Sequence, residues 1–261
     1  MSKLGKKQNI SNEAWLEAMA HIELTISRRE LDELAQKTVE DIQDKISGKT
    51  AAYAWSGGKD SIVLAKLCEE AGVRQSMTAI CDLEYPAFLR WALENKPEGC
   101  DVVNTGQNLE WLRKHPEMLF PQDSKTAARW FSIVQHRAQR IYAQNHNIDI
   151  MILGRRRADG NYVGHKSNIY TDGKGVTRFS PLADWSHEHI LAFIHYHRLP
   201  LPPIYNWHNG YLCGTHPWPA RAKTGSVENG WREVYNIDPD IVITAAELIP
   251  SAKAYMEVAG K

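Results

Sequence analysis

The hexapeptide Ser56-Gly57-Gly58-Lys59-Asp60-Ser61 contains charged and hydroxyl side chains next to two glycines, a combination suited to binding an anionic ligand. It lies between an apolar run and a segment with the apolar spacing of a helix. A glycine-rich turn at such a junction exposes backbone N–H groups at a helix N-terminus, where the helix dipole favours an anion. Lys59 adds a positive charge and the serines add hydroxyl donors. We therefore predict a phosphate-binding loop, against the alternative of an ordinary turn in which Asp60 caps the helix.

Asp60 is the unusual member of this loop, because a carboxylate repels phosphate groups unless a cation lies between them. A Mg²⁺ ion shared by Asp60 and the phosphates would remove the conflict, since magnesium binds carboxylate and phosphate oxygens. The loop is not a Walker A sequence, in which Ser or Thr follows the lysine. Asp60 is thus the candidate metal ligand.

Strands and helices alternate around the loop. The pattern predicts strands at 50–55, 76–82, 101–105 and 148–154, and helices at 60–72, 86–96, 108–115, 124–147 and 186–199. The run 148–154 is apolar throughout, as expected of a strand buried on both faces. Residues 155–180 have the composition of a loop or a short hairpin. Such alternation implies a parallel sheet wrapped by helices.

Three segments are expected along the chain. Residues 1–48 form an N-terminal helical segment, in which 11–47 make one or two helices that begin at Ser11 or Asn12. Residues 49–200 form the nucleotide-binding α/β domain. Residues 201–261 form an irregular or helical segment that covers the substrate. The first segment covers an edge of the sheet or forms a homodimer interface, and both alternatives stay open.

Bulk composition excludes several classes of protein. The net charge is zero and the pI about 7.2, so nucleic acid is a possible partner that the charge does not indicate. No run of about 18 apolar residues predicts a membrane span. The four cysteines form neither an adjacent pair nor a Cys-x-x-Cys pair, which argues against an iron–sulfur cluster. We expect a reducing, cytoplasmic compartment.

The loop resembles the PP-loop of the ATP pyrophosphatase superfamily. Two further segments, CDLEYPAFLRWA (81–92) and FSPLADWSHEHILAFIHYHRLPLPPIYNWHNGY (179–211), are similar to the branch that contains 3′-phosphoadenylylsulfate (PAPS) reductases. With ILGRRRADGN (152–161), the resemblance covers about residues 50 to 215. It implies an adenine-nucleotide α-hydrolase-like, Rossmann-like doubly wound sheet. It also implies an enzyme that splits ATP between its α and β phosphates, passes AMP to an acceptor and releases pyrophosphate.

Three arginines follow the strand at 148–154, after Gly154, at the sheet edge where α/β folds bind ligands. Arg155, Arg156 and Arg157 are candidates to hold the α-phosphate or an anionic acceptor through forked hydrogen bonds. Consecutive side chains cannot all face one site, so at least one is expected in solvent. We predict nucleotide contacts from Gly154, Arg155 and Arg157 and a catalytic role for Arg156.

Carboxylates near the predicted strand ends have two interpretations each. Asp82 and Glu84 follow the second strand and would contact a ribose hydroxyl or a metal, or cap the next helix. Asp82 is the stronger candidate for a nucleotide contact. Asp184 is expected to cap the helix at 186–199.

The reaction is the point on which the resemblance and the residues disagree. Reductases of this branch attack a sulfonate sulfur with the cysteine of a Glu-Cys-Gly-Leu-His tail. Here the last cysteine is Cys213, in LCGTHPW, and the glutamate is missing. Reductase loops also tend to lose the Lys-Asp pair, which this chain keeps. We therefore expect Mg²⁺-ATP to adenylate an unknown acceptor, with Lys59, Asp60 and Arg156 as catalytic residues and the loop amides stabilising the departing pyrophosphate.

Two alternatives to adenylation stay open. One is a sulfonucleotide reductase that uses Cys213 and a thiol carrier, and the other is a nucleotide-binding module without turnover. The aromatic segment 200–225, which contains His208, His216, Arg221 and Lys223, would border the nucleotide or form a loop packed by its own tryptophans. The histidine pairs of 186–199 are spaced i, i+2, which does not suit a helical metal site.

Overall fold

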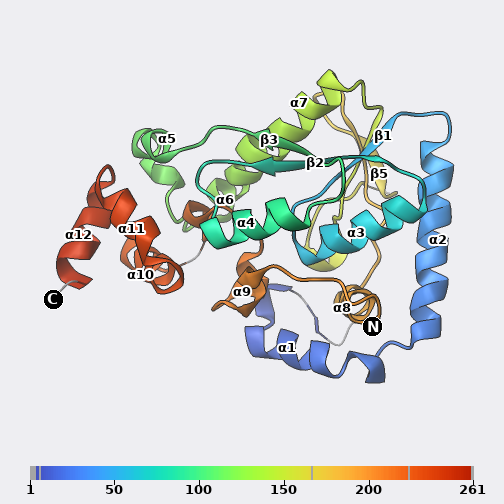
Figure 1. Ribbon diagram of the computed structural model, residues 1–261, viewed down its shortest axis with the longest axis horizontal. Coiled ribbons are helices and arrows are strands. Elements are labelled where there is room, and N and C mark those ends of the chain that lie inside the picture. The colour runs from blue at the N-terminus through green and yellow to red at the C-terminus, as the bar shows by residue number, and fades with distance from the viewer. Residues whose placement is uncertain (1–3, 6, 166, 223, 260–261) are drawn as a thin grey trace.

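A six-stranded sheet forms the centre of the computed structural model, which describes residues 4–5, 7–165, 167–222 and 224–259 (Figure 1). The strand order is β3-β2-β1-β4-β6-β5. The strands are β1 Ala51–Ala54, β2 Gln75–Ile80, β3 Asp101–Asn104, β4 Ile150–Ile152, β5 Ile169–Thr171 and β6 Thr177–Phe179. All neighbouring pairs are parallel except β5 and β6. The segment after β4 therefore contains the hairpin that its composition allowed.

Strand β1 lies between β2 and β4 and is buried on both faces. Ala52 pairs with Gln75 of β2 and with Met151 of β4. Its small side chain faces one cluster of buried apolar residues, while the next residue, Tyr53, faces the other. This alternation explains why the strand is apolar throughout, as in other buried parallel strands.

Helices cover both faces of the sheet. On one face lie α3 (Lys59–Glu70), α8 (His187–Tyr196), α4 (Pro86–Asn95) and, outside them, α2 (Arg28–Ile46). The other face carries α7 (Arg137–Asn145), which packs against β2 and β3. Figure 1 shows α7 and α3 on opposite sides of the strands. The predicted doubly wound α/β sheet is thus confirmed.

The helix predicted at 124–147 is interrupted. It consists of α6 (Ser124–Phe131), a π-helical turn η4 (Ser132–His136) and α7. A π turn admits one extra residue per turn and is common at functional sites. The apolar spacing of 124–147 was consistent with a single α-helix, so the sequence pattern alone did not predict the interruption.

Two helices precede the sheet in the chain. Helix α1 (Asn12–Ala20) is capped by the Ser11 side chain, and Ser27 caps α2. Short 3-10 turns lie at Lys7–Asn9 and Ile22–Leu24. Helix α1 packs against α8 and α9 (Gly210–Cys213), and α2 packs against α3 and α8. The N-terminal helices thus lie on the layer of helices that covers one face of the sheet.

The C-terminal region is more helical than its composition suggested. After the 3-10 turns η6 (Pro203–Asn206) and η7 (Trp218–Ala220) follow α10 (Val227–Ile237), α11 (Pro239–Ala246) and α12 (Pro250–Ala259). Trp231 of α10 packs edge-on against Phe120, whose ring centre is 5.0 Å away, and so joins these helices to the region of α5 (Leu109–Lys114) and η3 (Pro116–Met118). Among the described residues, no helix is both long and apolar enough to cross a membrane.

Candidate functional site

The loop between β1 and α3 has the geometry of an anion site. Gly57 adopts a left-handed φ of +68°, and a Cβ added there would lie 3.1 Å from the Phe88 ring. Gly58 is the N-cap of α3. The buried Ser61 hydroxyl accepts the Ser56 N–H at 3.0 Å and donates to the Gly58 carbonyl at 2.9 Å. Ser61 therefore holds the loop in shape at the N-terminus of α3, where the first amides of a helix have no partner within the helix.

A pocket of about 660 Å³ opens over this loop, a volume suited to a nucleotide. Five parts of the chain line it: Lys7 near the N-terminus, the loop with the end of β1, the helical segment that contains the π turn, the segment after β4, and the aromatic segment around α9. Of the predicted site residues, the pocket is lined by Ser56, Gly58, Lys59, Asp60, Ser61, Gly154 and Arg155. Gly57, Asp82, Arg156 and Arg157 are not part of its lining.

Lys59 and Asp60 form an ion pair in which Lys59 is buried and Asp60 is partly exposed. The Lys59 ammonium lies 2.6 Å from Oδ2 of Asp60, and its side chain is only 2% exposed. Nε of Arg156, which is fully buried, donates to Oδ1 of Asp60 at 2.7 Å. Burial acts to raise the pKa of Asp60, but Arg156 and Lys59 outweigh it and hold this pKa well below its usual range. Burial lowers the pKa of Lys59, and Asp60 opposes that change.

Arg156 extends this network into the core. Its Nη2 lies 2.9 Å from Oδ2 of Asp159 and 3.2 Å from Nδ1 of His187. Burial, followed by the charge of Arg156, lowers the pKa of His187 to about 4, so the ring is neutral at pH 7. The positive charges of Lys59 and Arg156 thus balance the negative charges of Asp60 and Asp159. These ion pairs hold the loop against the segment after β4. Gly154 allows this approach, because a Cβ there would lie 3.2 Å from the Asp60 carbonyl.

Arg155 is the arginine of the three that lines the pocket. Its Nη1 donates to the Tyr170 hydroxyl at 2.8 Å, and its Nη2 lies 2.6 Å from Nε2 of His136 in the π-helical turn. Burial, followed by the charge of Arg155, lowers the pKa of His136 to about 4. A neutral His136 accepts the hydrogen bond and orients the guanidinium. The exposed Arg157 instead pairs with Asp184.

Helix α8 is capped by Ser186, whose side chain accepts the N–H of His189. The prediction that Asp184 caps this helix is therefore wrong. Asp184 lies two residues too early in the chain for that position, and its carboxylate binds Arg157.

The aromatic segment supplies the side of the pocket nearest α9. Tyr205, Tyr211, Gly214, Thr215 and His216 line it. The His216 ring packs edge-on against Phe131, and burial lowers its pKa to about 4. His208 is exposed and is not part of the lining.

Arg221 lies away from the pocket lining. The buried guanidinium donates to Glu233 at 2.9 Å and to the Tyr85 hydroxyl at 3.4 Å. Cys213, partly exposed, immediately precedes the pocket-lining Gly214. Burial raises the pKa of Cys213, and the charge of Arg221 acts to lower it. Lys223 lies outside the described residues.

The carboxylates after β2 point elsewhere. Asp82 is exposed and accepts the Asn104 side-chain N–H at 2.6 Å. Glu84 is buried beside Cys81, whose N–H lies 3.3 Å from the carboxylate, and burial raises the pKa of Glu84 to about 8. In this structure neither reaches the pocket.

The donor set at Asp60 does not fit a protein-bound magnesium ion. Arg156 occupies one carboxylate oxygen and Lys59 the other. The part of the chain that the structure describes contains no group of three or more His, Cys, Asp or Glu side chains arranged for a metal. An Mg²⁺ ion at this site would need its ligands from the phosphates.

Some residues in or next to the pocket escaped the sequence analysis. Tyr205 binds the Lys59 amide, His136 binds Arg155, and Trp15 of α1 packs over the Lys59 ammonium at 5.4 Å from the ring centre. Tyr205 belongs to the segment 179–211 that resembles the PAPS reductase branch, and this resemblance was its only sequence signal. Trp15 and His136 had none, because each reaches the site through packing of a separate helix.

Comparison with known proteins reveals likenesses in sequence. The sequence profile described as the phosphoadenosine phosphosulfate reductase domain matches residues 50–213. A phosphoadenosine phosphosulfate reductase of Emericella nidulans is 29% identical over 105 residues, which cover 40% of this chain and 32% of that protein. The match to this curated relative therefore spans about a third of the relative's length.

Solved structures give likenesses in fold. The crystal structure of a PAPS reductase from Candida auris, in complex with phosphate, is similar at a TM-score of 0.50 and 12% identity, covering 70% of this chain and 92% of that one. An NMN synthetase from Francisella tularensis has a TM-score of 0.48 and 20% identity, over 65% of this chain and 71% of that one. At 12% identity, the likeness to the reductase structure concerns the fold alone.

Proposed function

The chain belongs to the family of phosphoadenosine phosphosulfate reductase domains, and on this premise we propose that it is an enzyme acting on an adenine nucleotide bound over the Ser56–Ser61 loop. The reaction proposed first is reductive cleavage of an adenosine 5′-phosphosulfate. Cys213 is the nucleophile, and a dithiol protein supplies the electrons. This reading takes precedence over adenylation by Mg²⁺-ATP, which the Lys-Asp pair of the loop suggested.

The pocket supports an anionic nucleotide. Arg155 and Lys7 contribute positive charge to its lining, and α3 directs its N-terminal amides there. Phe131, Tyr162 and Tyr211 add aromatic surface against which a base can stack. The 5′-phosphate lies at the loop in this proposal, and Arg155 neutralises the neighbouring anionic group.

The observation that carries the proposal is the position of Cys213 relative to the loop. Two residues after it, the Thr215 hydroxyl lies 3.4 Å from the point where a Cβ would stand on Gly58. The thiol is therefore close in sequence to a residue that touches the phosphate loop. Asp60 also neutralises Lys59, which weakens the argument that the loop requires a triphosphate.

The chemical step is a displacement at sulfur. The Cys213 thiolate attacks the sulfonate sulfur, an S–S bond forms, and the S–O bond breaks so that the nucleotide phosphate leaves with the electron pair. A carrier thiolate then attacks the Cys213 sulfur and releases sulfite. The second carrier thiol displaces Cys213 and leaves the carrier as a disulfide. Because the thiolate is the nucleophile, Cys213 must lose its proton to water before the first attack, and burial, which raises the pKa of Cys213, opposes that loss.

The test is a product assay with adenosine 5′-phosphosulfate or PAPS and a reduced dithiol carrier such as thioredoxin. Sulfite and the free nucleotide are expected in equal amounts from the wild type, and Cys213→Ser should abolish both. Cys100→Ala is the matched control, because it removes a buried thiol away from the pocket and should retain turnover. Unchanged sulfite formation by Cys213→Ser would disprove the nucleophile.

Adenylyl transfer is the second candidate, because it does not require Cys213 as a nucleophile. Burial raises the pKa of Cys213, and Cys213 is not among the described residues that line the pocket. Here an acceptor attacks the α-phosphorus of ATP and pyrophosphate leaves. Formation of pyrophosphate from ATP, with no sulfite formed from phosphosulfates, would support this candidate. Both candidates place the 5′-phosphate of an adenine nucleotide at the same loop.

A further inference from the structure

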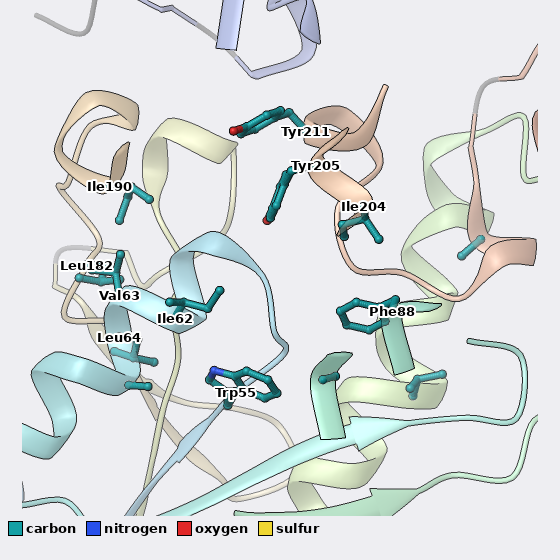
Figure 2. Packing of buried hydrophobic residues seen from close by; sticks show 14 of the residues in the cluster. Trp55, Ile62, Val63, Leu64, Phe88, Leu182, Ile190, Ile204, Tyr205 and Tyr211 are labelled. Carbon is teal, nitrogen blue, oxygen red and sulfur yellow. The ribbon is translucent and has the colours of Figure 1, made fainter. Parts of the chain in front are cut away.

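The Lys59 amide, the first of helix α3, is already occupied. It donates to the Tyr205 hydroxyl at 2.8 Å, and this bond is buried. Tyr205 comes from the 3-10 turn η6, and it lines the same pocket as the loop. In Figure 2 its hydroxyl end points toward the start of the helix that carries Ile62. A side-chain oxygen thus stands where an anion oxygen would bind the helix N-terminus.

Three side-chain hydroxyl groups lie close to Gly58. A Cβ on Gly58 would lie 3.4 Å from both the Ser56 and the Thr215 hydroxyl oxygens and 3.5 Å from that of Tyr205. These three oxygens come from the loop, from the segment after α9 and from η6. All three residues line the pocket together with Gly58.

Packing holds Tyr205 in this position. Its ring lies 4.7 Å from that of Tyr211, and Tyr211 stacks on Trp15 with ring centres 5.1 Å apart. Trp15 in turn covers the Lys59 ammonium. Displacing the Tyr205 hydroxyl would therefore disturb a chain of three packed aromatic rings.

Lys59 offers no free charge to compensate. Its ammonium is bound to Asp60 and is almost fully buried. Neither the first amide of α3 nor the charge of Lys59 is therefore free to bind a second phosphate group. One phosphate group can still use the following amides of α3 and the hydroxyls around Gly58.

We propose that Tyr205 is a specificity-determining residue that limits the loop to a single phosphate group and disfavours pyrophosphate and triphosphate chains. This inference rests on the proposed function only in placing a 5′-phosphate at the loop. It identifies the preferred ligands as adenosine 5′-monophosphate and its sulfonated derivatives rather than ATP.

The test measures dissociation constants by calorimetry for phosphate, pyrophosphate, AMP and ATP, with the wild type and Tyr205→Phe. The substitution removes the competing oxygen and leaves a buried amide in need of an acceptor. We expect pyrophosphate and ATP to bind about tenfold more tightly to Tyr205→Phe, with AMP and phosphate changed less than threefold. Tyr142→Phe is the matched control, since it removes a buried hydroxyl from α7, outside the pocket lining, without freeing the Lys59 amide, and should leave the preference among the four ligands unchanged.

Equal changes for all four ligands, or no change, would overturn the role of Tyr205. Wild-type protein that binds ATP more tightly than AMP would overturn it as well. Phosphate and pyrophosphate test anion binding at the loop without the adenosine group. If AMP does not bind, the proposed function is contradicted, but the comparison of pyrophosphate binding to the wild type and to Tyr205→Phe still tests the role of Tyr205. Tyr205→Leu provides the same comparison if Tyr205→Phe does not fold.

Discussion

At the scale of single residues, the most informative group is the cluster of Lys59, Asp60 and Arg156. All three were expected to act on the nucleotide, and the structure joins them to each other. Burying an ion pair removes both charges from water, so the arrangement persists only because each charge finds partners at hydrogen-bond distance. Their roles in catalysis stay predictions, whereas their contribution to the shape of the loop follows from these contacts.

Asp60→Asn should destabilise the protein by about 3 kcal/mol, because it leaves buried Lys59 and Arg156 with one negative charge fewer. Urea unfolding followed by circular dichroism measures the difference. Asp184→Asn is the matched control, since it breaks an exposed pair with Arg157 and should cost less than about 1 kcal/mol. Equal losses from both substitutions would show that the buried cluster has no special role.

At the scale of elements, the loop and the π-helical turn determine the pocket. Two adjacent glycines serve different purposes. Gly57 supplies a left-handed backbone, whereas Gly58, with φ −81°, supplies room over the helix terminus. Gly154 likewise allows the end of β4 to approach the backbone of Asp60. The π turn brings His136 to Arg155, so an irregular helix positions the charged group that lines the pocket.

Gly57→Ala should lose about 1–2 kcal/mol of stability, because its φ of +68° strains any residue with a Cβ and the Phe88 ring lies 3.1 Å from that position. Gly58→Ala has no such strain, but its methyl group stands among the three hydroxyls and should weaken AMP binding instead. Thermal unfolding and AMP titration of both variants separate the two effects. A stable Gly57→Ala with wild-type unfolding would contradict the assignment.

At the scale of the whole molecule, distant parts of the chain surround one site. Helix α1 contributes Trp15, η6 contributes Tyr205, and the segment after β4 contributes Arg155. Helix α1 therefore contacts the α/β domain at the candidate site, through the packing of Trp15 on Lys59. The proposed boundaries 1–48, 49–200 and 201–261 stay predictions, and so does a homodimer.

Stability should fall as the pH decreases from about 6.5 to about 4. Burial lowers the pKa of His187, His136 and His216 to about 4 in the folded state, from an ordinary value near 6.5. Between these values the unfolded chain binds protons that the folded chain does not, so acid favours unfolding. Each histidine contributes a slope of up to about 1.4 kcal/mol per pH unit. The contribution is fully present above pH 6.5.

His187→Gln should flatten this dependence, because it removes one of the three groups. The measurement is the urea unfolding free energy at half-unit steps from pH 4.5 to pH 8. Above pH 7, where neither state protonates His187, the difference between variant and wild type should be constant and serves as the baseline. Parallel curves down to pH 4.5 would show that burial of His187 does not govern the acid response.

The sequence by itself determined the features that depend on neighbouring residues. These are the glycine-rich loop at Ser56–Ser61 between a strand and a helix, the alternation of strands and helices, the two-sided burial of β4, and the family resemblance over residues 50–215. Glycine conformation, helix dipole and apolar periodicity act over a few residues, so they can be recognised without the fold. The interruption at Ser132–His136 and the cap of α8 were missed, because more than one local solution fits those segments.

Only the tertiary structure decided which groups are free to meet a ligand. Arg156 reaches Asp60 across 96 positions of sequence, and Tyr205 reaches the Lys59 amide across 146. The sequence does not distinguish the three adjacent arginines, but the structure buries Arg156, places Arg155 in the pocket lining and exposes Arg157 to solvent. Partners that far apart meet only when the sheet brings β1 and β4 together and the C-terminal segment folds back over them. The position and the partners of each charge at the site therefore depend on packing.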